Sequence, residues 1–286
     1  MLVAPANHEA VILGWSDRRQ HESLDLATAC FTGRPSVRVG VEVRIMIVTD
    51  AWEPQVNGVV RTLKSTRREL ERLGHQVDML TPLEFRTLPC PTYPDIRLSL
   101  LPGRKLRRRI SEFAPQAIHI ATEGPLGIAA RAYAISQCVP YTTAYHTRFP
   151  EYVHARIRLP LSVTYRFLRW FHGGAGAVMV PTEVVRRDLV ANGFDPARVV
   201  LWSRGVELDI FKPGPAMAHD LAKPIFLCVG RVAVEKNIEA FLRLDLPGSK
   251  WVAGAGPALA KLKLQFPEVH FTGVLACLAT IDRQRA

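Results

Sequence analysis

Short apolar runs alternate with amphipathic stretches along most of the chain, beginning at Val43. Runs typical of buried strands occupy residues 45–48, 76–81, 117–121, 141–145, 177–180 and 199–202, and then 225–229, 250–253 and 269–272. After the first run, apolar residues recur at spacings of four and three over residues 59–73, and Gly74 stands where a helix C-cap belongs. Strands that alternate with helices predict an α/β fold with mostly parallel sheets and helices on both faces.

Two stretches depart from this pattern. Residues 1–42 hold a few short apolar stretches around a polar run at 16–23, so we expect them to lie outside the fold. Residues 88–94 are rich in proline, which predicts a loop that crosses between elements. We therefore expect an extension over 1–42, a first Rossmann-like domain over 43–204 and part of a second Rossmann-like domain over 205–286.

Each predicted domain contains a turn with glycine between a strand and a helix. The first turn follows residues 45–48 and includes Asn57-Gly58-Val59, and the second follows residues 225–229 and runs from Gly230 to Asn237. A buried strand that leads through such a turn into a helix directs backbone N–H groups and the positive helix end at one spot, which suits a phosphate. The two turns predict two nucleotide-binding domains that face a shared cleft.

The composition bounds the kinds of function. A hydrophobic content of 48% over 286 residues is sufficient for a substantial core. No uninterrupted apolar stretch reaches the ~18 residues of a membrane span, so we expect a soluble protein or one bound to a membrane surface. The five scattered cysteines form no C-x-x-C pair, so we expect reduced thiols in a cytoplasmic protein. The formal net charge of +11 predicts an anionic partner.

The positive charge is concentrated in two clusters. The first opens a predicted helix and consists of Arg104, Lys105, Arg107, Arg108 and Arg109. The second, over residues 156–171, places Arg166 and Arg169 among bulky apolar residues that include Trp170. Basic side chains that alternate with apolar and aromatic ones fit a surface lying on an anionic bilayer. A solvated helix face that packs its other side on the core explains the same pattern, and both interpretations remain open.

Three motifs, in this order, carry a family resemblance. They are Pro54-x-x-Asn57-Gly58-Val59, the run from Trp202 to Phe211, and Gly230-Arg231-x-x-x-Glu235-Lys236-Asn237. Over roughly residues 43–274 the chain resembles the retaining glycosyltransferases of family 4. The resemblance implies the GT-B fold, in which two Rossmann-like halves enclose a nucleotide-sugar cleft. It also implies transfer of a hexose from a nucleotide-sugar, of the GDP-mannose or UDP-glucose type, to a lipid acceptor with retention of configuration.

The resemblance assigns catalytic or donor-binding roles to four residues. Gly58 matches the loop glycine whose backbone approaches the donor diphosphate, and Arg231 and Lys236 match the cations that neutralise the pyrophosphate and the departing nucleotide. Fixed cations suit this step because breaking a sugar–phosphate bond builds negative charge on the leaving group. His146, at the end of a predicted strand, matches a histidine that faces the donor sugar.

Two carboxylates are candidates for the acceptor side. Asp50 follows the first strand and Glu123 follows the run at 117–121, and each could contact an acceptor hydroxyl or simply serve as a helix-capping or loop carboxylate. The resemblance implies no protein nucleophile. It implies front-face attack instead, in which the acceptor hydroxyl enters on the side that the diphosphate leaves and a phosphate oxygen takes the proton, so that no side-chain base is needed. The nine histidines show no metal-ligand spacing, so we expect neither a metal nor another cofactor.

The end of the chain leaves alternatives to an active enzyme. The family's Glu-x7-Glu segment, which by resemblance holds the donor sugar and ribose, would lie beyond Ala286. The chain therefore resembles a truncated member, and an inactive fragment that binds only acceptor or membrane is the first alternative. A basic nucleic-acid-binding protein is the second, but no zinc-finger or RNP-type aromatic signature supports it, so we expect no nucleic-acid partner.

Overall fold

The computed structural model describes residues 42–55, 57–90, 93–146, 149–205, 208 and 220–274. The predicted extension over residues 1–42 lies outside the described residues, apart from Glu42. Two compact units make up the chain, Met1–Arg204 and Gly205–Ala286.

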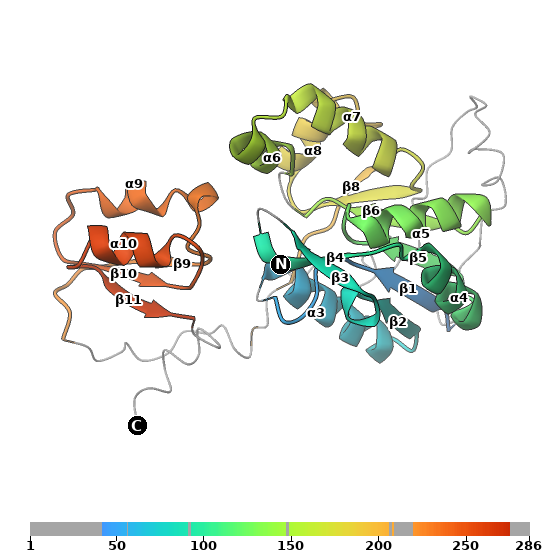
Figure 1. Cartoon of the computed structure of the whole chain (residues 1–286), viewed down its shortest axis with the longest axis horizontal. Helices are drawn as coiled ribbons and strands as arrows, with labels where there is room; N and C mark the ends of the chain where they lie inside the picture. The colour runs from blue at the N-terminus through green and yellow to red at the C-terminus, as the bar shows by residue number, and fades with distance from the viewer. Residues whose placement is uncertain are drawn as a thin grey trace. The chain divides into compact units, whose positions relative to one another are not determined.

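In the part of the chain that the structure describes, a six-stranded parallel sheet forms the centre of the first unit, in the order β2-β1-β5-β6-β7-β8 (Figure 1). The strands are β1 (Arg44–Val48), β2 (Gln76–Leu80), β5 (Ala117–Ile120), β6 (Tyr141–Ala144), β7 (Ala177–Val180) and β8 (Val199–Leu201). All four residues of β5, β6 and β7 are buried, as is usual for central parallel strands covered on both faces. The buried polar residues His119 in β5 and Thr142 and Thr143 in β6 form side-chain hydrogen bonds.

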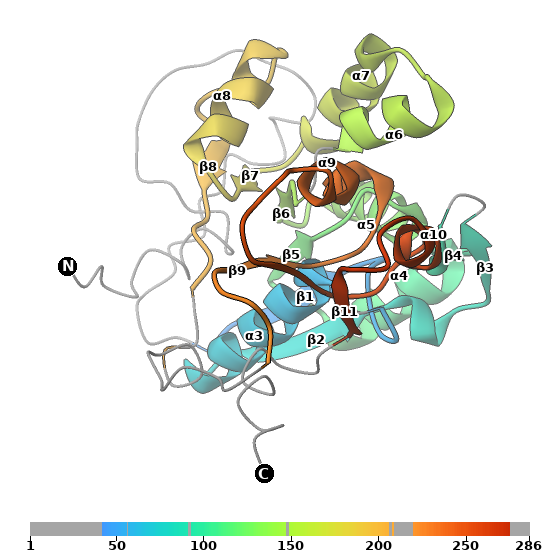
Figure 2. The same ribbon diagram turned by 90° about the vertical axis from the view of Figure 1, so that its left-hand side faces the viewer.

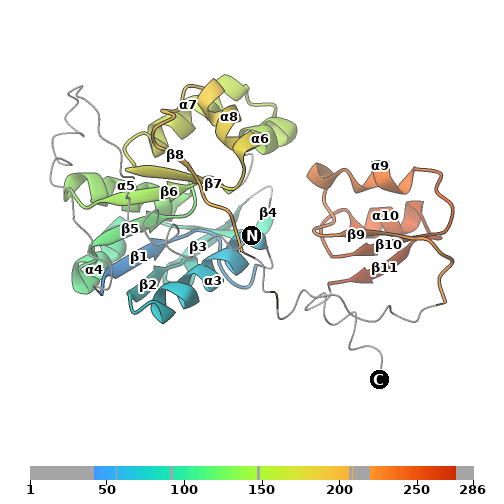
Figure 3. The same cartoon turned by 180° about the vertical axis from the view of Figure 1, so that it is seen from behind.

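Helices pack on both faces of this sheet (Figure 3). They are α3 (Gly58–Arg72), α4 (Gly103–Phe113), α5 (Pro125–Ser136), α6 (Phe149–Ile157), α7 (Leu161–His172) and α8 (Glu183–Ala191). Successive side chains of β1 point to opposite faces, so Ile45 and Ile47 pack with Leu63 of α3, whereas Met46 and Val48 belong to the cluster that contains α4 and α5 residues. The first unit is therefore a three-layer α/β structure.

The C-terminal end of helix α3 lies where the sequence predicts, next to Gly74, and its N-cap is a finding of the structure. The side chain of Asn57 caps its first turn by accepting a hydrogen bond from the backbone N–H of Val60 at 3.0 Å. Gly74 has φ +91°, a conformation that a residue without Cβ adopts readily after a helix. The predicted apolar face is buried at Leu63, but its last member, Leu73, is 47% exposed.

The loop predicted over residues 88–94 is wrong. After a short 3-10 helix η1 (Pro82–Glu84), strands β3 (Thr87–Cys90) and β4 (Tyr93–Ser99) pair as a two-stranded antiparallel sheet (Figure 2). In such a sheet each strand is an edge, so a proline without an N–H can direct its nitrogen away from the ladder. Pro89 lies opposite Arg97 in this pairing.

The second unit also has a parallel sheet among its described residues, in the order β11-β10-β9. Its elements are β9 (Ile225–Val229), the 3-10 helix η2 (Val234–Lys236), α9 (Ile238–Leu242), β10 (Ser249–Ala253), α10 (Leu259–Gln265) and β11 (His270–Gly273). Val252 of the central strand packs with Ile238 and Leu242 of α9 and with Leu262 of α10. The predicted α/β class is confirmed in both units.

Candidate functional site

The carboxyl edge of the first sheet gathers three of the predicted site residues. Asp50, Glu123 and His146 follow β1, β5 and β6, which are adjacent strands running in the same direction. Helix α3 begins beyond the same end of β1, with Gly58 as its first residue. Open α/β sheets bind ligands outside this edge, so the fold places these residues where a ligand site is expected.

His146 is hydrogen-bonded to a residue that the sequence analysis did not single out. Its Nδ1 lies 2.9 Å from Nη2 of Arg204, which follows β8. A guanidinium only donates, so Nδ1 must accept and the single ring proton of a neutral imidazole must sit on Nε2. The ring of Trp202, in the same segment as Arg204, lies 5.9 Å from the imidazole. The only sequence signal for Arg204 was its place in the motif that begins at Trp202.

The surroundings keep His146 uncharged. Burial, with contributions from the charges of Arg204 and His119, lowers the pKa of His146 to about 3. Burial also lowers the pKa of Arg204. The Nε2 atom of His146 is buried and has no hydrogen-bond partner among the described residues. At neutral pH the ring is therefore a neutral group with one N–H to donate.

Gly58 lies beside the same guanidinium. A Cβ added to this glycine would lie 4.0 Å from Nη1 of Arg204 and would meet no closer atom outside its chain neighbours and its own helix. The amino end of a helix carries partial positive charge, and Arg204 adds a full one. No ion pair with a carboxylate is found for Arg204 among the residues that the structure describes. The two positive groups make this corner of the edge suitable for an anion.

Asp50 has a structural task at the start of α5. It is 4% exposed, and its carboxylate accepts hydrogen bonds from the backbone N–H groups of Leu126 at 3.0 Å and Gly127 at 3.3 Å and from the hydroxyl of Thr122 at 3.0 Å. These bonds cap the first turn of α5, which matches the alternative interpretation of a helix-capping carboxylate. Burial nevertheless raises the pKa of Asp50, against the effect of these hydrogen bonds.

Glu123 faces the interior of the first unit. Its Oε1 lies 3.5 Å from Nε2 of His172 in α7, and its side chain is 12% exposed. The Nδ1 of His172 lies 2.8 Å from the hydroxyl of Thr143 in β6. Glu123 Oε1 and His172 Nε2 are both buried, and neither has a hydrogen-bond partner among the described residues, so the 3.5 Å approach is a contact and not a hydrogen bond.

The turn after β9 holds Arg231 and Lys236 in the second unit. Arg231 is half-buried, and Lys236 is exposed at the end of η2. Helix α9 has five residues, so its dipole is weak and a phosphate bound at this turn would depend on the two side-chain cations. Gly230, with φ +147°, donates its backbone N–H to the carbonyl of Ala253 at 2.9 Å, which ties the turn to the end of β10.

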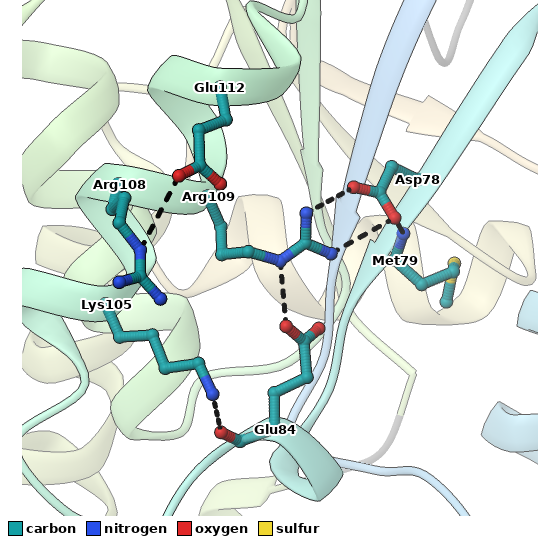
Figure 4. A network of polar contacts seen from close by, with 7 residues as sticks. All are labelled: Asp78, Met79, Glu84, Lys105, Arg108, Arg109 and Glu112. Atoms are coloured by element: carbon teal, nitrogen blue, oxygen red, sulfur yellow. Dashed lines mark hydrogen bonds and ion pairs between the residues drawn. The ribbon is translucent and has the colours of Figure 1, made fainter.

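The first basic cluster divides into exposed and occupied residues. Arg104 and Arg107 are exposed, Arg108 lies 3.6 Å from Glu112, and Lys105 donates to the backbone carbonyl of Glu84. Arg109 is not available to a membrane, because its side chain lies between β2 and η1 (Figure 4). Its Nε is 2.8 Å from Glu84 and its Nη1 is 3.1 Å from Asp78, which corrects its assignment as a surface candidate.

The second basic cluster is more exposed. Arg166 and Trp170 lie on the exposed side of α7, and the guanidinium of Arg131 lies 4.3 Å from the Trp170 ring centroid in a cation–π contact. Arg169 donates to the carbonyl of Asn192 at 2.8 Å, so part of its hydrogen-bonding capacity serves to hold α7 against the end of α8.

Within the described ranges, no three His, Cys, Asp or Glu side chains lie close enough together to hold a metal ion. Nor is any helix in those ranges both long and apolar enough to cross a bilayer.

Comparison with known proteins identifies the family. A sequence model described as Glycosyltransferase Family 4 matches residues 56–210. The sulfoquinovosyl transferase of Arabidopsis thaliana is 30% identical over 249 residues, which are 77% of this chain and 49% of that protein. A GDP-mannose-dependent alpha-mannosyltransferase of Mycobacterium tuberculosis is 26% identical over 258 residues, covering 81% of this chain and 68% of that protein. An alpha-monoglucosyldiacylglycerol synthase of Streptococcus pneumoniae is 26% identical over 275 residues, covering 82% and 62%.

Solved structures support the same conclusion at the level of the fold. Sucrose-phosphate synthase from Thermosynechococcus elongatus superposes with a TM-score of 0.58 at 17% identity, covering 82% of this chain and 71% of that chain. The Anabaena protein HepE, crystallised with UDP and glucose, gives a TM-score of 0.55 at 13% identity, covering 82% and 70%. These likenesses confirm the predicted GT-B class, although the chain spans only about half the length of the plant relative. Since the family model matches more than half of its residues, this chain belongs to glycosyltransferase family 4.

Proposed function

We propose that this chain acts in the transfer of a hexose from a nucleotide-sugar to a lipid acceptor with retention of configuration. The observation that carries the proposal is the cluster of Gly58, His146 and Arg204 at the carboxyl edge of the first sheet. It combines a helix amino end, a cation and a neutral N–H donor, which together suit a phosphorylated sugar. Membership of family 4 supports the class of reaction.

The positive groups around the site suit a transfer in which the leaving phosphate, and not a side chain, takes the acceptor proton. In the proposed step the bond between the sugar C1 and the diphosphate oxygen breaks, and a bond from C1 to the acceptor oxygen forms on the same face. The acceptor proton passes to an oxygen of the leaving phosphate, so no side-chain base is needed. His146 suits this scheme because its Nδ1 lone pair is already used by Arg204. Arg231 and Lys236 are proposed to neutralise the charge that develops on the leaving nucleotide.

The names of the relatives support the proposed substrates. One relative is named for its dependence on GDP-mannose, and another is named for a glucosylated diacylglycerol. We propose a donor of the GDP-mannose or UDP-glucose type and a lipid acceptor on that basis.

We further propose that the first unit lies on an anionic membrane surface, at the inner face of the cytoplasmic membrane. Arg104, Arg107 and Arg166 support this, because their charged groups are exposed. Trp170, 49% exposed, provides an aromatic ring of the kind that lies at the boundary between headgroups and acyl chains.

The proposal is tested with the purified chain, radiolabelled GDP-mannose and UDP-glucose, and diacylglycerol or phosphatidylinositol in vesicles. Binding of GDP and UDP is measured in parallel by calorimetry, because binding does not require turnover. Arg231→Ala and Lys236→Ala should each weaken nucleotide binding and lower any transfer by about 10²–10³-fold. Lys261→Ala, on α10 of the same unit, is the control and should change neither quantity.

Two results would contradict the proposal. The first is the absence of both transfer and nucleotide binding at millimolar ligand. The second is transfer that is unchanged in Arg231→Ala and Lys236→Ala. Vesicle binding without any nucleotide binding would instead favour a protein that recognises only the membrane or the acceptor.

A further inference from the structure

We infer that Arg204 is a positioning residue that holds His146 as the neutral tautomer with its proton on Nε2, so that this histidine donates a hydrogen bond to an oxygen of the bound donor. The inference deepens the proposed function and rests on it only for the identity of the ligand. The tautomer itself is a property of the chain without ligand.

The hydrogen bond fixes which nitrogen carries the proton. The Nη2 atom of Arg204 lies 2.9 Å from Nδ1 of His146, and every nitrogen of a guanidinium is a donor without acceptor capacity. A proton on Nδ1 would face an N–H of the guanidinium and break the contact. A doubly protonated ring would add repulsion between two cations. Only the Nε2–H tautomer satisfies both groups.

The packing leaves the ring little freedom to turn away. Trp202, two residues before Arg204, is 7% exposed, and its backbone N–H donates to the carbonyl of Val180 at 2.8 Å. The Trp202 ring lies 5.9 Å from the ring of His146 and also 5.9 Å from that of His119, which meets it edge-on at 79°. His119 is fully buried, and its Nδ1 lies 2.9 Å from the hydroxyl of Thr142. The segment that carries Arg204 is thus anchored to the sheet beside His146.

The remaining proton of His146 is available to a ligand. Its Nε2 is buried without a hydrogen-bond partner among the described residues, and a buried N–H that lacks a partner costs free energy until one arrives. The Gly58 end of α3 lies beside Arg204, so an anionic ligand drawn there would bring oxygen atoms close to this N–H. The arrangement gives His146 the role of a donor and denies it that of a general base.

No neighbouring carboxylate opposes this state. The charged and titratable groups that bear on the imidazole are Arg204, from the segment after β8, and His119, from β5. Of the two carboxylates at the same edge, Asp50 caps α5, and Glu123 places its Oε1 3.5 Å from Nε2 of His172. A protonated His146 would therefore have no negative group among the described residues to stabilise it.

The test uses the full chain labelled with ¹⁵N-histidine and long-range ¹H–¹⁵N NMR without ligand. The signals of His146 are identified by their loss in His146→Gln. In the unsubstituted chain they should show a protonated Nε2 and an unprotonated Nδ1 at pH ~7, and the ring should remain neutral down to pH ~5, since its pKa is about 3.

Variants at position 204 separate positioning from a general structural effect. Arg204→Met removes the donor, so His146 should populate both neutral tautomers. Its pKa should rise only by the part that Arg204 contributes, because burial, the larger cause of the lowered pKa, remains. Arg204→Lys keeps a donor and should restore the Nε2–H form. The control is Arg187→Met, which removes an exposed arginine of α8 and should leave the His146 signals unchanged.

The outcomes are separable from those of the proposed function. A protonated Nδ1 in the unsubstituted chain would overturn the inference even if Arg204→Met did not fold. An unchanged tautomer and pKa in a folded Arg204→Met would overturn it as well. GDP-mannose or UDP-glucose should then shift the Nε2–H signal of the unsubstituted chain. The expected tautomer without any such shift would contradict the role as a ligand donor, whereas failure of nucleotide binding altogether would count against the proposed function.

Discussion

The carboxylate of Asp50 accepts a hydrogen bond at 3.0 Å from the backbone N–H of Leu126, which lies 76 residues further along the chain. Leu126 is in the first turn of α5, whose N-cap residue is Gly124. A glycine has no side chain with which to cap a helix, and a Cβ at this position would lie 2.4 Å from Cγ of Asp50. The glycine makes room for a capping carboxylate that comes from the end of β1.

This cap predicts a loss of stability in Asp50→Ala. The substitution leaves buried N–H groups at the start of α5 without an acceptor, so the free energy of unfolding should fall by about 1–3 kcal/mol. Asp50→Asn keeps one acceptor oxygen and should lose less. Urea denaturation followed by circular dichroism measures the effect. Glu53→Ala is the control, because its exposed ion pair with Lys64 should contribute less than about 1 kcal/mol. Equal stability of Asp50→Ala and the unsubstituted chain would contradict the capping role.

The sequence was a good guide where the determining interactions are local. The strands of the two parallel sheets and the C-terminal end of α3 follow from runs of neighbouring residues, and Gly74 stands at the predicted cap. The role of Asp50 depends on a partner 76 residues away, and that of Arg204 on His146, 58 residues away. The sequence around each of these residues does not show which distant residue is its partner. The hairpin at β3 and β4 was missed because proline argues against a central strand but not against an edge strand.

Arg109 should contribute to stability and not to membrane binding. It lies between Asp78 and Glu84, and these carboxylates raise the pKa of its guanidinium. Its side chain is 27% exposed, so Arg109→Met should lower the free energy of unfolding by about 1–2 kcal/mol, between the values for exposed and buried pairs. Arg109→Lys keeps the charge, but a single ammonium group lacks the several N–H donors with which the planar guanidinium binds both carboxylates. Its free energy of unfolding should therefore lie between those of Arg109→Met and the unsubstituted chain. Thermal denaturation of the two variants checks the order, and full stability of Arg109→Met would contradict it.

The exposed arginines should govern binding to anionic vesicles. Arg104→Ala, Arg107→Ala and Arg166→Ala should each weaken co-sedimentation with vesicles that contain phosphatidylglycerol, by about 1 kcal/mol per charge. Added salt should reduce binding by the unsubstituted chain, because exposed charges are screened over ~8 Å at physiological ionic strength. Arg187→Ala, an exposed arginine of α8 outside both clusters, is the control. Equal binding to neutral and anionic vesicles would remove the membrane surface from the proposed function.

His119 should make the first unit less stable in mild acid. Its burial lowers its pKa to about 4 in the folded chain, below the ordinary value of ~6.5 that applies after unfolding. Between these two values the unfolded chain binds the extra proton, so the free energy of unfolding falls as the pH falls, by about 2 kcal/mol at pH ~5. His119→Gln cannot take up this proton. The difference between the urea midpoints at pH ~7.5 and pH ~5 should therefore be smaller in His119→Gln than in the unsubstituted chain. Some pH dependence should remain in the variant, because His146, whose pKa is also lowered, is present in both chains. An identical pH dependence in both chains would contradict the prediction.

Gly254 should be indispensable to the turn that carries Arg231. A Cβ at Gly254 would lie 1.8 Å from the carbonyl oxygen of Gly230, which is a backbone atom, and the φ of +152° is itself one that other residues rarely adopt. Gly254→Ala must therefore push apart the turns after β9 and β10, which are joined by the hydrogen bond from Val232 N–H to the carbonyl of Ala255 at 3.0 Å. Overpacking and backbone strain together should destabilise the second unit by about 3 kcal/mol.

Hydrogen exchange over residues 220–274 measures this effect in the unit concerned. Gly254→Ala should exchange faster there and should also bind nucleotide more weakly, because Arg231 directly follows Gly230. The control is Gly205→Ala in the same unit, where an added Cβ meets nothing within 4 Å and exchange should stay unchanged. If Gly254→Ala kept its protection and lost only nucleotide binding, the contact between the two turns would be adjustable, and the glycine would be needed for the approach of the ligand instead.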